Sequence, residues 1–333
     1  MNFRPVRHSL LFFVALFVCS GFGHGQTCLT ADDMDKPTLS GLEETAKRYF
    51  DMAARNDSVS LKQNAIPGLA GDFSGVEAAL KENQPFLIGA QPTVHPPFLL
   101  KVEGKVAIDR AEFLCGVFGA NGQTANSAEF IIPNIAPGNY AIEIVDASGG
   151  KEPRTITFVL QQMGTEWKLG GFYVRSMQIG GHDSQWFAEK ARAFKAKGQT
   201  HNAWFYYLAA RDMLVPITFM YTQATDKMYD EMQTAKPSDL PTEAPVDLSA
   251  GGKTYKLTSL FPLPEGKDFD LVVKYQSPDV SNSSKTFDEN TAVMKALLTK
   301  YPEYRDAFDG VVARAVEPSG RDYGSMLAMK DIK

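Results

Sequence analysis

The densest run of β-branched and aromatic side chains in this chain is RTITFVLQQMGTEWKLGGFYVRSM, residues 154–177. Such side chains favour strands, and the tight turn at Met163-Gly164-Thr165 divides the run into the two arms of a long β-hairpin. Gly170-Gly171 interrupts the second arm, where paired glycines indicate a β-bulge or a bend. A bulge exchanges the two faces of a strand. The alternation of side chains along the second arm therefore predicts which residues face inward only before Gly170.

Helices precede this hairpin along the chain. A capping box at Ser40–Glu43 predicts an amphipathic helix over residues 41–55, and a second box at Ser74–Glu77 opens a short helix that Pro85 ends. From residue 98 the pattern changes to strands, with turn residues at Pro137-Gly138 and at similar breaks between them. Helices followed by a run of antiparallel strands predict the α+β class.

The segment 40–178 resembles the nuclear-transport-factor-two-like family in this order of elements and in its ending, Trp167-Lys168-Leu169-x-x-Phe172-Tyr173. The resemblance implies a cystatin-like cone, in which N-terminal helices close a curved antiparallel sheet around a pocket. An immunoglobulin- or transthyretin-like β-sandwich is the alternative for the sheet, suggested by Phe130-Ile131-Ile132-Pro133 followed by Pro137-Gly138-Asn139-Tyr140. The leading helices favour the cone.

The rest of the chain returns to helical spacing and then to strands. Residues 182–235 predict a helical hairpin, similar to a single tetratricopeptide repeat, and a third helix. One such repeat cannot bury its own faces, so it must pack on a neighbouring domain. Residues 236–247 hold three prolines among polar residues and predict a semi-rigid linker. Strand and helix patterns over 248–333 predict a small α+β domain that is large enough to fold alone.

Residues 1–25 have the pattern of a bacterial-type secretory signal peptide, with a basic start, an apolar core over 10–18 and small residues before Gln26. The sequence therefore predicts export to the periplasm or the extracellular space, and no membrane span in the mature chain. The alternative is a lipoprotein with lipid on Cys19, but Phe17-Val18 are not the small residues that such a site prefers. Loss of Arg4 and Arg7 on cleavage takes the net charge from −5 to about −7, which argues against nucleic-acid binding.

Two cysteines, Cys28 and Cys115, remain after cleavage. In an exported chain they allow one disulfide from the mature N-terminus onto the sheet, and the alternative is a free Cys28 with a buried thiol at Cys115. No metal site is expected, because His95, His182 and His201 have no partner at ligand spacing. No phosphate-binding glycine loop or dinucleotide fingerprint occurs, so no cofactor is expected.

Arg175 is the charged residue of the hairpin that is placed to meet a ligand. Together with Trp167 and Tyr173 it predicts a site for a small anionic ligand, since a guanidinium fork suits a carboxylate. The alternative is an arginine at the edge of the sheet. In the aromatic run 204–207, Phe205 and Tyr206 are predicted to face a partner protein, with burial of the whole helix as the alternative.

These observations predict an exported, non-catalytic protein that binds a ligand or acts as a protein-interaction scaffold. The alternative is an enzyme of the hydrolase or isomerase type that uses the cone interior, with His95 and Asp109 as the nearby acid–base candidates. The triad-like run His182-Asp183-Ser184 is better explained as a helix start, because triads are assembled in space and not along the chain.

Overall fold

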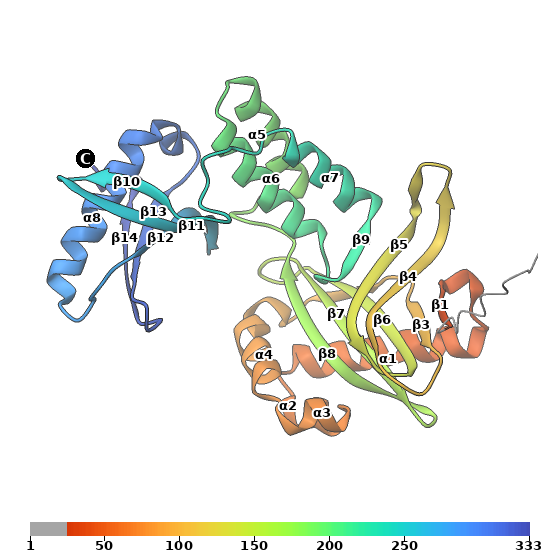
Figure 1. The fold of residues 1–333 in the computed structure, drawn as a ribbon. Coiled ribbons are helices and arrows are strands. Elements are labelled where there is room, and N and C mark those ends of the chain that lie inside the picture. The colour runs from red at the N-terminus through yellow and green to blue at the C-terminus, as the bar shows by residue number, and fades with distance from the viewer. Residues whose placement is uncertain (1–24) are drawn as a thin grey trace, which may run out of the picture.

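The structure is a computed structural model that describes residues 25–333. The predictions on the signal peptide and on Cys19 concern residues before this range. Helices and three sheets share the described residues, so the protein belongs to the α+β class, as the sequence predicts (Figure 1). Its buried residues form an N-terminal lobe, residues 26–176 with the short strand β9, and a C-terminal lobe, which holds the other elements after residue 178.

The N-terminal lobe is built on an antiparallel sheet that contains the hairpin 154–177. Leu160 pairs with Leu169 across this hairpin, whereas the adjacent Val159 pairs with Gly171. Gly170 is therefore the extra residue of a β-bulge, which confirms the prediction of an irregularity there. The strands lie in the order β1–β3–β6–β7–β8, and β2 pairs with β6. Their bounds are β1 (Gln26–Leu29), β2 (Gln91–Val94), β3 (Phe98–Val102), β6 (Gly138–Ser148), β7 (Arg154–Met163) and β8 (Glu166–Ser176).

Four helices cover one face of this sheet and form its main core with it. Tyr49 and Phe50 of α1 are buried in this core together with Phe158 and Leu169 of the hairpin. The Tyr49 hydroxyl also donates a hydrogen bond of 3.0 Å to the carbonyl oxygen of Trp167, which ties the helix to the bulged strand. The helices are α1 (Lys36–Ala54), α2 (Ser58–Gln63), α3 (Pro67–Gly71) and α4 (Ser74–Leu87).

The ends of two helices differ from the sequence prediction. Helix α1 begins a turn before the predicted capping box, because the carboxylate of Asp35 already accepts a hydrogen bond from the backbone N–H of Thr38. Helix α4 continues through Pro85 to Leu87. A proline near the end of a helix removes one backbone hydrogen bond but does not have to stop the last turn.

A second sheet of three strands packs on the opposite face of the first. Strands β4 and β5 form a long hairpin, and the short β9 pairs with β5. Phe113 and Phe130 of this hairpin share a buried core with Leu100 and Ile142 of the first sheet. The strands are β4 (Ile108–Gly119), β5 (Gly122–Ile135) and β9 (Met220–Thr222).

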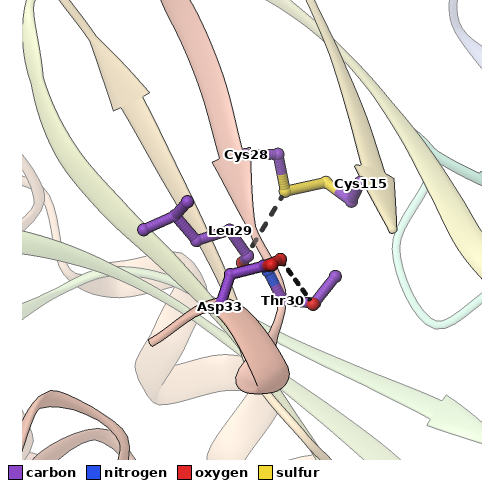
Figure 2. Close-up of a disulfide and its surroundings, with 5 residues drawn as sticks. All are labelled: Cys28, Leu29, Thr30, Asp33 and Cys115. Atoms are coloured by element: carbon purple, nitrogen blue, oxygen red, sulfur yellow. Dashed lines mark hydrogen bonds between the residues drawn. A yellow bond between two sulfur atoms is a disulfide. The ribbon is translucent and has the colours of Figure 1, made fainter. Parts of the chain in front are cut away.

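A disulfide between Cys28 of β1 and Cys115 of β4 joins the edge strands of these two sheets (Figure 2). Their Cα atoms are 5.1 Å apart, within the usual range for a disulfide. Just after β1, the carboxylate of Asp33 accepts hydrogen bonds from the backbone and the hydroxyl of Thr30. These bonds shape the short 3₁₀ turn η1 (Ala31–Asp33), so the disulfide and the turn together fix the start of the described chain.

The C-terminal lobe combines four helices with a sheet of five strands in the order β10–β11–β12–β13–β14. Neighbouring strands are antiparallel except β12 and β13, which are parallel and are connected through helix α8. A parallel pair needs such a crossover connection. The helices are α5 (Ser184–Ala196), α6 (Thr200–Leu214), α7 (Gln223–Gln233) and α8 (Ser283–Lys300), and the strands are β10 (Val246–Ala250), β11 (Lys253–Glu265), β12 (Asp268–Gln276), β13 (Gly310–Val316) and β14 (Asp322–Ala328).

The helical hairpin α5–α6 and the C-terminal sheet bury one common hydrophobic core. Phe187 of α5 and Tyr206 of α6 each contact Phe269 of β12, with ring centroids 5.2 Å apart in both pairs. The repeat-like hairpin thus covers its apolar face against the C-terminal sheet. Within residues 25–333, no helix is long and apolar enough to cross a membrane.

The proline-containing segment 236–247 packs on the C-terminal lobe, where the sequence predicts a linker. Leu240 is buried, and β10 begins at the end of the segment. The carboxylate of Asp239 accepts a hydrogen bond of 2.7 Å from the Tyr301 hydroxyl and lies 2.8 Å from Nε2 of His201. Proline spacing alone does not reveal these contacts, because they depend on residues more than 30 positions away in the chain.

Candidate functional site

A cleft of about 530 Å³ lies between the two lobes. Its floor is the end of the central hairpin at Val174 and Ser176, one wall is α6, and the other is the turn between β11 and β12. Ligand sites occur preferentially at such boundaries between lobes and have volumes in roughly this range. The apolar part of the lining consists of Phe86, Val174, Leu208, Met213, Pro262 and Phe269.

Positive charges outnumber negative charges in the lining of the cleft, although the whole chain is acidic. Local charge of one sign between apolar walls concentrates the field and favours ligands of the opposite sign. The cleft is therefore suited to an anion. The charged residues of the lining are Lys151, Arg154, Arg175 and Arg211 against Glu152 and Asp212.

Arg154 holds the floor of the cleft in place. Its side chain is almost fully buried, and its guanidinium donates hydrogen bonds to the Ser176 hydroxyl over 2.6 Å and to the Glu152 carboxylate over 3.1 Å. The same group lies over the ring of Phe86, 3.8 Å from its centroid. Because these partners engage both terminal nitrogens and the side chain is almost fully buried, Arg154 organises the site and is not the residue that meets a ligand.

Two arginines of the cleft have free donors: Arg211, whose buried Nε has no partner among residues 25–333, and Arg175. Arg175 is the one that pairs with an acid of the lining. Its ion pair with Asp212 has an N–O distance of 3.8 Å, at the outer limit for such a pair, and a third of its side chain is exposed. Among residues 25–333 it has no side-chain hydrogen bond within ordinary distance. An arginine has five N–H donors arranged as a fork, so most of this fork is available to a carboxylate.

The other two residues of the predicted ligand site do not join Arg175. Trp167 packs with the core under the helices, whereas Tyr173 is 42% exposed and is not part of the cleft. The bulge at Gly170 puts Trp167 on the other face of β8 from Arg175, because it changes which residues of the strand share a face. The ring of Tyr173 lies across Gly171, where a side chain would come within 2.9 Å of it. The predicted trio is therefore wrong as a single site, and Arg175 alone enters the cleft.

The prediction that Phe205 and Tyr206 face a partner protein is wrong. Both side chains are buried, and the Tyr206 hydroxyl donates a hydrogen bond of 2.7 Å to the carbonyl oxygen of Ala307. Burial raises the pKa of Tyr206 well above its usual value. Aromatic residues surround the helix because it is covered on several sides by the C-terminal lobe, which is the alternative that the sequence left open.

The two acid–base candidates lie apart in the structure. His95 forms a pair with Asp146, with 2.7 Å between Nε2 and the carboxylate oxygen, whereas Asp109 is exposed on β4. Sequence reasoning missed Asp146, because its position opposite His95 depends on the pairing of β2 with β6. In residues 25–333, no group of three or more potential ligand side chains is arranged to hold a metal ion.

Glu143 is a second acid that the sequence did not single out. Its side chain is fully buried on β6 under helix α1, and neither carboxylate oxygen has a hydrogen-bond partner. Burial, with a smaller contribution from the negative charge of Glu43, raises the pKa of Glu143 to about 8. The alternation of β6 holds a signal for it, because Glu143 lies on the same face as the core residues Ala141 and Val145.

Comparison of the chain with models of protein families, with curated proteins and with solved structures finds no match.

Proposed function

We propose that the protein is an exported binding protein that holds a small organic anion in the cleft between its lobes. The observation that supports this proposal most directly is the environment of Arg175. Its guanidinium lies in a partly apolar cleft, forms one long ion pair and has free donors. The apolar walls at Phe86 and Phe269 favour an anion that also carries a hydrocarbon or aromatic part. The aromatic residues expected at a partner surface are buried, so a protein partner forms no part of this proposal.

Asp212 is the residue that a bound anion would replace next to Arg175. Its side chain is 73% exposed, and an exposed ion pair contributes little to stability, about 0–1 kcal/mol. Releasing it therefore costs little. A carboxylate that engages the guanidinium fork with two hydrogen bonds gains more, because charge-assisted hydrogen bonds contribute about 1.5–3 kcal/mol.

Native mass spectrometry of the purified protein, followed by calorimetric titration with aromatic and short aliphatic carboxylates, tests this proposal. For a carboxylate that binds, Arg175→Gln should weaken binding about 10- to 100-fold, as expected for the loss of a charge-assisted hydrogen bond. Arg192→Gln is the matched control, because it removes the same charge from α5 in a surface pair with Glu231. Equal affinity in both variants would overturn the assignment of the site.

A further inference from the structure

A groove of about 830 Å³ lies on the N-terminal lobe where the end of α6 and the start of α7 meet it, and it is a different site from the cleft that contains Arg175. Its sides are the η1 turn, the segment that joins β2 to β3, the β4–β5 hairpin, and the β9–α7 connection. Met213 lines both cavities and stands between them. The groove lies within the volume range of small-molecule sites, roughly 300–1,000 Å³. Its apolar lining includes Phe98, Val117, Ile144, Leu214 and Met220.

The hydrogen-bonded pair of His95 and Asp146 lies in this apolar lining. The Asp146 carboxylate lies 2.7 Å from Nε2 of His95 and accepts a hydrogen bond of 2.8 Å from the hydroxyl of Thr155, its neighbour across the strands. The backbone N–H of His95 donates to the carbonyl oxygen of Ile144. Pro96, which follows His95, restricts its backbone to extended conformations. The position of the imidazole is thus fixed by a hydrogen bond of the His95 backbone and by the hydrogen bond of its ring to Asp146.

The second ring nitrogen of His95 is available to a ligand. Nδ1 makes no hydrogen bond to any residue from 25 to 333, and 44% of the side chain is exposed. The other histidines of this range differ, because His201 has carboxylates at both nitrogens and His182 stacks on Trp186. Since Asp146 keeps a proton on Nε2, Nδ1 is the atom that accepts or donates a proton towards the groove.

The charges around the pair make the protonated imidazole favourable. The hydrogen bond that Nε2–H of His95 donates to the Asp146 carboxylate raises the pKa of His95 above its usual value. Burial acts to raise the pKa of Asp146, but the hydrogen bonds from His95 and Thr155 hold it below its usual value. The remaining charged groups of the lining are the exposed Asp32 on η1 and the exposed Lys227 on α7. With His95 protonated, the positive charges of His95 and Lys227 equal the negative charges of Asp146 and Asp32, so the lining carries no net charge.

We propose that this groove binds an apolar monocarboxylic acid, with the hydrocarbon chain on the apolar lining and the carboxylate accepting a hydrogen bond from Nδ1–H of His95. The carboxylate enters as an anion. Where the free imidazole is neutral, one proton is taken up from the solvent and stays on Nδ1, so the bound state contains an imidazolium between two carboxylates. The proton balance of binding is therefore a direct signature of this geometry.

Calorimetric titration with decanoate tests the proposal, in buffers of different ionisation enthalpy at about pH 6 and about pH 8.5. Proton uptake per decanoate should be larger at the higher pH, where less of the free His95 is protonated, than at the lower pH. His95→Gln should abolish the uptake and weaken binding about 10- to 100-fold. Decanol, which has no carboxylate, should bind without proton uptake and with no response to His95→Gln.

Two further variants locate the ligand. Val117→Asp places a negative charge on an exposed wall residue of the groove and should abolish decanoate binding without loss of folding. Arg175→Gln should leave decanoate binding unchanged, so failure of the proposed function of the cleft and failure of this inference are separate results. Absence of decanoate binding, binding without proton uptake at the higher pH, or loss of binding in Arg175→Gln would overturn the inference.

Discussion

Glu143 should make the stability of the N-terminal lobe depend on pH. In the unfolded chain this carboxyl ionises near its ordinary pKa of 4.5, whereas in the folded protein it keeps its proton up to a pKa of about 8. Between these values the unfolded state binds fewer protons, so the free energy of unfolding falls as the pH rises. Moving the pKa from 4.5 to about 8 corresponds to about 5 kcal/mol in total, at 1.36 kcal/mol per pH unit.

Urea unfolding of the wild type and of Glu143→Gln at a series of pH values measures this contribution. The amide of glutamine has nearly the same shape and does not ionise, so the variant should lose the falling slope of up to about 1.4 kcal/mol per pH unit between about pH 4.5 and pH 8. Near pH 8 the variant should therefore be the more stable protein.

The control for this measurement is Glu82→Gln, an exposed substitution on α4 that should keep the pH dependence of the wild type. Parallel curves for the wild type and Glu143→Gln across this range would refute the reasoning, because they would show that Glu143 is already ionised in the folded protein. The reasoning would also be refuted by a Glu143→Gln variant that is less stable than the wild type at every pH and whose free energy of unfolding changes with pH as the wild type's does.

Two further changes test the packing. Replacing Cys28 and Cys115 with serine should lower the free energy of unfolding by about 2–5 kcal/mol, because the bridge closes a loop between residues 87 positions apart, and a loss below about 1 kcal/mol would contradict this. Tyr206→Ala should cost about 3–5 kcal/mol, since it empties a core position and leaves the carbonyl of Ala307 without its hydrogen bond. A nearly unchanged melting temperature would show that this face of α6 is exposed after all.

Local sequence signals predicted the elements of the fold well. The β-branched and aromatic run gave the hairpin, and its paired glycines identified the place of the bulge at Gly170. Helical spacing likewise found α5, α6 and α7. These features depend on neighbours within a few residues, which is the range over which periodicity and turn chemistry act.

The candidate sites could be predicted only in part, because they depend on contacts between distant segments. Arg175 was recognised, but the cleft that contains it needs residues from both lobes, such as Phe86 and Phe269. His95 was recognised without Asp146, since the register of β2 on β6 brings the two together. Tyr206 was assigned to a surface because the sequence of a helix does not show which of its faces a later domain will cover.

The bond between Cys28 and Cys115 turns the backbone between them into a closed covalent ring. The helices α1 to α4 and the strands β2 and β3 all belong to this ring. A protease that cuts one peptide bond inside it opens the ring but releases no fragment, since both pieces stay attached through sulfur. A single nick in this half of the N-terminal lobe therefore becomes visible as two chains only after reduction.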